Sequence, residues 1–303
     1  MFISLLSCML ISAEAMQHAI GVISFTLPPW RGPRQLVSVG PLGRFFDVGP
    51  GDVSLYVQSD GSTRRLPSSE LPPRPADHRR IVAISDTHSK HRFVQIPPCD
   101  VLCHCGDILQ RYGHIGGLGG GIPALIDFAS WLRTVPADHA VVIAGNHDRL
   151  LEKLGDKAVR KILKQSGATY LRDSSAVVGG LIFYGSPWSP SGGTGNRAFQ
   201  SGAHAAGVAS NASEALRKTP SANIGDIEID VLLTHCNCKE WEALSSRASF
   251  WAHGHFHDGT GTAEIIKGGC VSINVASTDM IYRPRNPPIV FDVPLSRGNA
   301  LAN

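Results

Sequence analysis

Residue types that bind metal ions follow short apolar runs at several places in this sequence. Asp86 and His88 come shortly after the apolar residues 81–84, and Asp107 follows the apolar residues 101–103. Residues two positions apart in a strand point to the same side, so the carboxylate and the imidazole of Asp-x-His can hold one ion together. The remaining candidates, also placed after apolar runs, are Asn146, His235, His255 and His257.

These candidates amount to two Asp, one Asn and four His. Such a mixture of nitrogen and oxygen ligands is typical of Mn, Fe or Zn rather than of Ca or Mg. Each motif by itself is weak evidence, because a single Asp-x-His usually belongs to a solvated turn. Their order along the chain, each after an apolar run, is what predicts a metal centre.

The cysteines allow a second interpretation, a structural zinc site. The chain has seven cysteines, and two Cys-x-Cys pairs are formed by Cys103, Cys105, Cys236 and Cys238. Structural zinc sites usually separate their cysteines by two to four residues, which disfavours this interpretation. We expect reduced thiols, since an odd number without a regular framework does not indicate disulfides. Cys105 and Cys236 would then be small apolar fillers beside the metals.

The elements that must position these residues alternate between strands and helices. Short β-branched runs predict buried strands at 81–84, 101–103, 140–144 and 230–233. Helices are predicted at 122–134 and 149–165, and the region from 269 to 294 is again rich in strands. Residues 191–213 indicate a long loop over the site with part of a helix. This alternation indicates an α/β protein whose ligands gather at the carboxyl ends of the strands.

Composition limits the classes of function. The chain has 303 residues, 43 % of them hydrophobic and 17 % charged, so it is neither a disordered protein nor a coiled coil. A net charge of +3 and an aromatic content of 7 % give no signal for a nucleic-acid or membrane partner. The expected partner is a small molecule, and we make no prediction of oligomeric state.

The chain divides by composition into three parts. Residues 1–79 are a Pro- and Gly-rich extension, partly irregular, with a short hairpin expected near residues 53–57. Residues 80–294 are the expected domain, and residues 295–303 are a short tail. The first residues are apolar, but no Lys or Arg precedes Arg31, so the positive region of a secretory signal is missing. We expect a cytoplasmic protein, with secretion as the alternative if residues 1–15 are a signal peptide.

The order of the motifs resembles the calcineurin-like metallophosphoesterase superfamily over roughly residues 80–294. That order is Asp-x-His, Gly-Asp, Gly-Asn-His-Asp, a lone His, and Gly-His-x-His. Within it, residues 84–88, 184–188 and 282–292 resemble the metallophosphoesterase-domain-containing proteins of animal brain and fungi. The resemblance implies a four-layer αββα sandwich, in which two mixed β-sheets are covered by helices on both outer sides.

The resemblance also implies a role for each candidate. A first divalent ion would be held by Asp86, His88, Asp107 and His257. A second would be held by Asp107, Asn146, His235 and His255. His147 matches the residue that protonates the leaving oxygen, and we place Asp148 with it in the catalytic set. The ions would be Mn, Fe or Zn, with Mn expected to support activity in vitro. Such a pair of cations generates a bridging hydroxide and neutralises the phosphoryl oxygens.

Departures from the family pattern bear on the substrate. Phosphoprotein phosphatases of this superfamily carry Arg where Ala144 stands and Asp where Gln110 stands, while Arg111 retains one of their clamps. Fewer arginines to hold a terminal dianion favour a diester over a phosphoprotein. Many relatives also follow the lone His with Gly-Pro-Pro, where this chain has Cys236-Asn237-Cys238, which leaves the surroundings of the second ion open.

The function predicted from the sequence is a phosphodiesterase that acts on small nucleotides, cyclic nucleotides included. Trp188, ahead of the Gly- and Ser-rich loop, would stack on a base, and Arg111 would also contact the substrate; burial of Trp188 under the loop is the alternative. A non-catalytic scaffold of the same fold is a rival interpretation, which the loss of a ligand would favour. A nuclease or a phosphomonoesterase is another.

Overall fold

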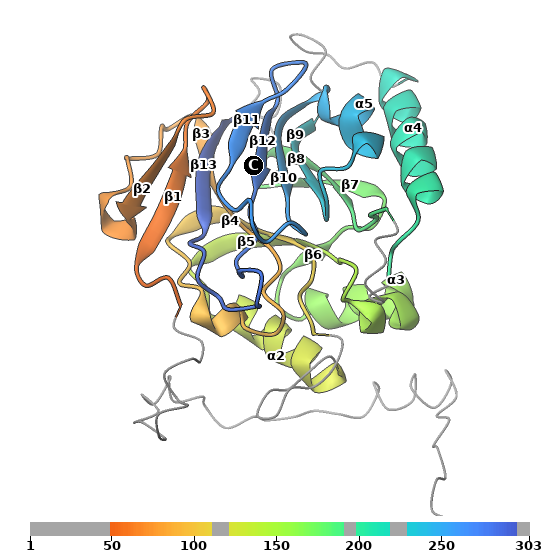
Figure 1. Ribbon diagram of the computed structural model, residues 1–303, viewed down its shortest axis with the longest axis horizontal. Helices are drawn as coiled ribbons and strands as arrows, with labels where there is room; N and C mark the ends of the chain where they lie inside the picture. The colour runs from red at the N-terminus through yellow and green to blue at the C-terminus, as the bar shows by residue number, and fades with distance from the viewer. Residues whose placement is uncertain (1–48, 111–120, 191–197, 219–228, 296–303) are drawn as a thin grey trace, which may run out of the picture. The chain divides into compact units, whose positions relative to one another are not determined.

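The computed structural model describes residues 49–110, 121–190, 198–218 and 229–295, which build two mixed β-sheets (Figure 1). The first sheet has seven strands in the order β2-β1-β13-β3-β4-β5-β6. Its strands are β1 (Val53–Val57), β2 (Thr63–Pro67), β3 (His78–Ile84), β4 (Cys99–Cys105), β5 (Ala137–Ile143), β6 (Thr169–Tyr170) and β13 (Ile289–Pro294). Strands β3 to β6 run parallel, whereas β13 is antiparallel to β3, and β2 to β1.

The second sheet has six strands in the order β11-β12-β10-β9-β8-β7. Its strands are β7 (Ser174–Val178), β8 (Leu181–Ser186), β9 (Ile229–Thr234), β10 (Ala248–His253), β11 (Ala263–Ile265) and β12 (Val271–Asn274). The four central strands are parallel, and the two edge strands pair antiparallel to them. The predicted mixture of parallel and antiparallel strands is thus present in both sheets.

Alternate residues of each strand face opposite layers of the molecule. In β3, Ile81 and Ala83 belong to the core between the two sheets, whereas Val82 and Ile84 belong to the core under helices. This is why the sequence shows an uninterrupted apolar run instead of an alternating one. The same division holds in β9, where Leu233 faces the first sheet and Leu232 faces outward.

Helices cover the outer face of each sheet, as Figure 1 shows. The helices α2 (Ile122–Leu132) and α3 (Arg149–Lys164) pack on the first sheet. The helices α4 (Gly202–Lys218) and α5 (Glu242–Ser245) pack on the second. Three short 3₁₀ turns complete the described elements: η2 (Ser68–Glu70), η3 (His91–Phe93) and η4 (Lys239–Trp241). The predicted four-layer α/β sandwich is confirmed.

The chain before residue 80 contributes strands to the first sheet. The hairpin expected near residues 53–57 is formed by β1 and β2, and β1 also pairs in parallel with β13. Residues 1–48, which include the candidate signal peptide, lie outside the described residues, as do residues 296–303. Helix α4 begins inside the segment predicted as a loop with part of a helix. None of the described helices has the length and apolarity needed to cross a membrane.

Candidate metal centre

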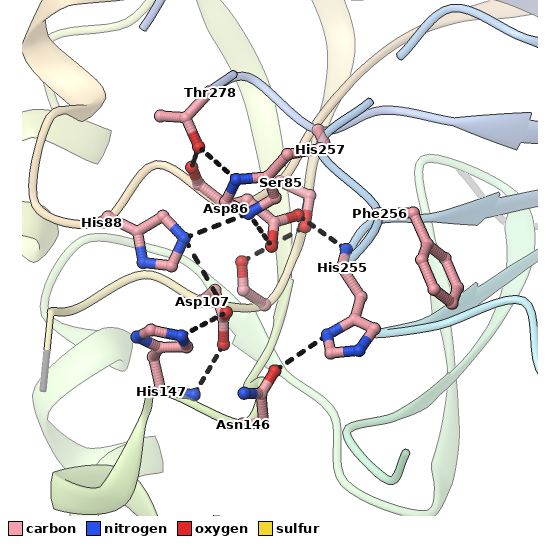
Figure 2. A network of polar contacts seen from close by, with 12 residues as sticks. Ser85, Asp86, His88, Asp107, Asn146, His147, His255, Phe256, His257 and Thr278 are labelled. Atoms are coloured by element: carbon pink, nitrogen blue, oxygen red, sulfur yellow. Dashed lines mark hydrogen bonds and ion pairs between the residues drawn. The ribbon is translucent and has the colours of Figure 1, made fainter. Parts of the chain in front are cut away.

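Asp86, His88 and His257 meet beyond the carboxyl end of β3. Asp86 and His88 follow that strand, and His257 lies in the turn after β10. The Oδ1 atom of Asp86 is 3.3 Å from Nε2 of His257, and the Nε2 atoms of the two imidazoles are 3.4 Å apart. Figure 2 shows the three side chains converging, and their ligand atoms all lie within 4.8 Å of one another. The structure therefore brings together three of the four residues expected around a first ion.

Asn146, His235 and His255 form a second group beside the first. The Oδ1 atom of Asn146 lies 2.8 Å from Nε2 of His235 and 3.0 Å from Nδ1 of His255. Asp107 lies between the groups, because its Oδ1 is 3.4 Å from Nε2 of His235 and its Oδ2 is 3.8 Å from Nε2 of His88. One carboxylate thus borders both groups, as a ligand shared by two ions would.

Two of the imidazoles are turned so that acceptor atoms face one another. Nδ1 of His235 lies 3.0 Å from the carbonyl oxygen of Cys105, and Nδ1 of His257 lies 3.0 Å from that of Asp279. A carbonyl oxygen only accepts, so each Nδ1 donates, and in the neutral ring Nε2 carries a lone pair. Those Nε2 atoms face side-chain oxygens that also accept hydrogen bonds. When the rings are neutral, a cation between these facing lone pairs takes the place of the proton that Nε2 otherwise carries, so the donor set fits divalent metal ions.

The charges of the buried groups suit a cation as well. Burial raises the pKa of Asp107, but the neighbouring His235 and His147 lower it by more, so this carboxylate is ionised. Burial lowers the pKa of His88 to about 3 and that of His255 to about 4, which leaves both imidazoles neutral. Burial also lowers the pKa of His235, but Asp107 raises it to about 10. A bound cation acts in the opposite direction and favours the neutral ligand.

Two glycines allow the ligands to approach the backbone closely. A Cβ atom at Gly254 would lie 2.1 Å from Oδ2 of Asp86, and one at Gly145 would lie 2.3 Å from Oδ1 of Asp107. In place of a side chain, the backbone N–H of His255 donates to Asp86 Oδ2 at 2.9 Å. The glycines in Gly-Asn-His and Gly-His-x-His are therefore part of the site, because no larger residue fits there.

Four of the candidate ligands have a strained backbone. The φ angles of Asp86, His88, Asp107 and His255 are 53°, 44°, 53° and 70°. Such angles are uncommon for residues with a Cβ atom, and they concentrate at functional sites. The sharp turn after each strand directs the side chains back across the sheet edge, toward the common centre.

His147 lies at the border of the first group. Its backbone N–H donates to Oδ1 of Asp107 at 2.8 Å, and its Nε2 lies 3.9 Å from Oδ2 of the same residue. The ring centroid is 4.6 Å from that of His88, and the side chain is 12 % exposed. An imidazole that is close to the metal ligands and still reached by solvent can transfer a proton to a bound substrate.

The carboxylate of Asp148 is bonded to backbone N–H groups. It accepts hydrogen bonds from the N–H groups of Ile108, Leu109 and Gly145, at 3.2, 2.8 and 2.8 Å. Burial and the nearby Asp107 raise the pKa of Asp148 to about 7. The sequence places this residue in the catalytic set with His147, whereas its contacts join the turn after β4 to the turn after β5, which is the role of a positioning residue.

Only one of the two expected substrate residues lies within the described part of the chain. Arg111 lies outside the described residues. Nε1 of Trp188 donates to Oδ2 of Asp173 at 2.9 Å, and its ring packs against Phe199 and His204, with centroids 5.7 and 4.0 Å away. These are the contacts of a packing residue, so stacking of Trp188 on a base stays a prediction without support from its surroundings.

Several residues that support the site are not among the functional residues that the sequence analysis singles out. Thr278 donates to the backbone carbonyl of Asp86 at 2.8 Å, and the hydroxyl of Thr87 lies 2.9 Å from Nε2 of the buried His104. Tyr282 places its ring beside three of the imidazoles. Single Thr and Tyr residues occur in every protein, and only the fold shows which of them lie next to the ligands.

The prediction that all thiols are reduced is wrong for two of them. Cys236 and Cys238 form a disulfide, with Cα atoms 5.5 Å apart, in the turn that follows the ligand His235. The turn brings residues two positions apart to the Cα separation that a disulfide needs, which the count of cysteines could not reveal. Cys103 and Cys105 are free and buried, and both lie in the core between the sheets.

Several known proteins are similar to this chain. The profile of the family described as calcineurin-like phosphoesterase matches residues 79–259. Metallophosphoesterase domain-containing protein 1 of Homo sapiens is 27 % identical over 75 % of this chain and 74 % of its own length. UPF0046 protein C25E10.12 of Caenorhabditis elegans is 31 % identical over 72 % of this chain and 82 % of its own. The structure of TT1561 of Thermus thermophilus superposes with a TM-score of 0.46 at 13 % identity, over 67 % of this chain and 90 % of that one. The family matches confirm the resemblance that the order of motifs predicted.

Proposed function

Because the chain belongs to the calcineurin-like phosphoesterase family, we propose that this metal-dependent phosphoesterase hydrolyses phosphodiesters of small nucleotides, cyclic nucleotides included. The observation that favours a diester is the alanine at position 144. Ala144 lies directly before the Gly145-Asn146-His147 turn, and its side chain is fully buried. A terminal phosphate dianion is held best by bidentate arginine, and a methyl group at this position holds none of its charge.

The metal ions would be held by the two groups of ligands around Asp107. When bound, they would supply a nucleophile at neutral pH and neutralise charge on the phosphoryl oxygens. The imidazole and carboxylate donors support Mn as the ion for activity in vitro, with Fe or Zn as the other members of the same class. His235 and His257 are oriented for this role by the carbonyls of Cys105 and Asp279.

His147 would donate the proton that the leaving oxygen needs. It is held at the site through its backbone N–H, which donates to Asp107, so its ring is placed by the same carboxylate that borders both ligand groups. Proton donation by a positioned side chain contributes about 10²–10⁴-fold to the rate. Asp148 supports this arrangement indirectly, since it accepts hydrogen bonds from the backbone shortly after Asp107 and shortly before His147.

A substrate screen with the Mn-loaded protein tests the proposal. Cyclic nucleotides, bis(p-nitrophenyl) phosphate, p-nitrophenyl phosphate and a phosphopeptide would be compared by kcat/KM. We expect kcat/KM to be higher for the diesters than for the monoesters. A preference for the monoesters would contradict the argument from Ala144, and no hydrolysis of any ester would contradict the proposed activity.

Replacement of the proton donor gives a sharper prediction. His147→Ala should retain its metal and lose about 10²–10⁴-fold in kcat toward a cyclic nucleotide, whose alkoxide is a poor leaving group. The kcat toward bis(p-nitrophenyl) phosphate should fall much less, because p-nitrophenolate leaves without needing a proton. His139→Ala, at an exposed position of β5, is the matched control and should leave both rates unchanged. Equal losses on the two esters would remove His147 from this role.

A further inference from the structure

Tyr282 lies beside three imidazoles of the site, although it is 25 positions away from the nearest of them in the sequence, His257. Its ring centroid is 4.7 Å from that of His88, 5.2 Å from that of His257 and 5.9 Å from that of His147. The ring stands at 81° to His88 and at 86° to His257, so it meets both imidazoles edge-on. Its side chain is only partly buried, so part of the ring is open to solvent and to a ligand.

The loop around Tyr282 holds the ring in this place. Its φ angle is 61°, an uncommon value for an aromatic residue, and its N–H donates to the carbonyl of Asp279 at 2.8 Å. The Asp279 carboxylate accepts from the N–H groups of Ile281 and Arg283 at 3.1 and 2.9 Å, and from Nε of Arg283 at 2.7 Å. Nζ of Lys90 donates to the carbonyl of Tyr282 at 2.6 Å. So many bonds around one strained residue indicate that the position of the ring is specified by the fold.

The position of the ring relative to His147 shows what it would contact. If His147 donates a proton to the leaving oxygen, that oxygen lies at the His147 side of the bound phosphate. The Tyr282 ring borders both His147 and His88, so it lies next to the group attached to the leaving oxygen. Aromatic rings contribute to binding by contact with other rings, whose flat faces bury apolar area at little cost in entropy.

We propose that Tyr282 is a specificity-determining residue whose ring packs against an aromatic or nucleoside group on the leaving side of the phosphodiester. This inference rests on the proposed function and replaces Trp188 with Tyr282 as the aromatic surface for the substrate. Met280 and Ile281 precede Tyr282 in the same loop, and their side chains are 66 % and 65 % exposed. Neither of these two is assigned a contact with the substrate, which makes them suitable controls.

Ligand binding to the Mn-loaded protein tests the inference without turnover. Phenyl phosphate, methyl phosphate and inorganic phosphate would be titrated calorimetrically into the wild type, Tyr282→Ala, Tyr282→Phe and Ile281→Ala. We expect Tyr282→Ala to raise the Kd for phenyl phosphate by about 5- to 140-fold, the range that corresponds to loss of one stacking partner. Methyl phosphate and inorganic phosphate should bind as they do to the wild type. Tyr282→Phe and Ile281→Ala should bind all three ligands as the wild type does.

Other outcomes would overturn the inference. Equally weaker binding of all three ligands to Tyr282→Ala, or a lower Mn content of that variant, would show that the ring only supports the imidazoles. A Tyr282→Phe variant that behaves like Tyr282→Ala would assign the effect to the hydroxyl instead of the ring. A wild type that hydrolyses diesters but binds phenyl and methyl phosphate equally would overturn this inference alone, whereas no hydrolysis of any ester would overturn the proposed function.

Discussion

At the level of single residues, the candidate ligands depend on neighbours that have no side chain. Gly254 occupies a position where a Cβ atom would lie 2.1 Å from both Asp86 Oδ2 and Ser85 Oγ, and neither atom belongs to a flexible chain end. The Asp86 carboxylate also accepts the N–H of His255 in the same turn. One methyl group at Gly254 would therefore displace the Asp86 carboxylate, a candidate metal ligand.

Gly254→Ala should reduce both metal affinity and stability. We expect a loss of about 1–3 kcal/mol in the free energy of unfolding, as is usual for overpacking, together with at least a tenfold weaker affinity for Mn. Urea unfolding and metal titration measure the two quantities. The control is Gly207→Ala in α4, where a Cβ atom meets nothing within 4 Å and which should be neutral or slightly stabilising. Unchanged Mn affinity in Gly254→Ala would contradict this account of the turn.

The residue types at the candidate site could be read from the sequence, but some of their partners could not. Asp86, His88 and Asp107 stand out because each follows an apolar run. The role of Asp148 depends on backbone N–H groups about 40 residues away in the chain, at Ile108 and Leu109. The place of Tyr282 likewise depends on a loop conformation with positive φ, which no pattern of residue types predicts.

At the level of elements, the turn after the Asp-x-His motif is tied to a helix. The 3₁₀ turn η3 begins at His91, and its side chains reach Asp127 of α2. Arg92 donates to Oδ1 of Asp127 at 2.7 Å, and Nε2 of His91 lies 3.1 Å from its Oδ2. Partial burial raises the pKa of Asp127, but the hydrogen bonds from His91 and Arg92 lower it by more, well below its usual range.

Asp127→Asn should therefore destabilise the protein in a pH-dependent way. A carboxylate whose pKa is depressed in the folded state stabilises the folded protein at pH values above its unfolded pKa of about 4. This contribution is lost as the pH falls below that value, toward the pKa of the folded state. We expect the variant to be less stable by about 1–2 kcal/mol at pH 7, with the difference shrinking in acid. Urea unfolding between pH 3 and pH 8 measures it, with Asp138→Asn at an exposed position as control. A difference that does not depend on pH would contradict the assignment.

The strands that carry the ligands could be predicted, whereas their neighbours in the sheets could not. The runs before Asp86 and Asp107 are apolar because β3 and β4 are buried on both faces, a local property that the sequence displays. The place of β1 next to β13 is a pairing between the two ends of the described chain, and no local pattern records such a partner. For the same reason, the two edge strands β7 and β11 gave no clear signal.

At the level of the whole molecule, the candidate centre is shared by the two sheets. Asp86, Asp107 and Asn146 follow strands of the seven-stranded sheet, whereas His235 and His255 follow strands of the six-stranded sheet. Ligands from both sheets come together only when the core between the sheets is packed. Metal binding and folding are therefore linked, because the unfolded chain has no such site.

Metal ions should accordingly stabilise the folded protein. At a free Mn concentration of 100 times Kd, a single site adds about 2.7 kcal/mol to the free energy of unfolding. We expect EDTA to lower Tm and added Mn to restore it, as measured by calorimetry. Calcium is the control ion, because imidazole ligands suit it poorly, and it should shift Tm much less. Equal effects of calcium and Mn would point to binding outside the imidazole cluster.

The most direct test of the central claim is the Mn content of the wild type and of Asp107→Asn after equilibrium dialysis. Asp107 borders both groups of ligands, and its replacement by an uncharged amide of the same shape removes the one charge that two ions would share. The account predicts two bound ions per chain in the wild type. It predicts that the folded variant loses at least one ion and no longer hydrolyses diesters. A folded Asp107→Asn variant that keeps two ions and full activity would contradict it.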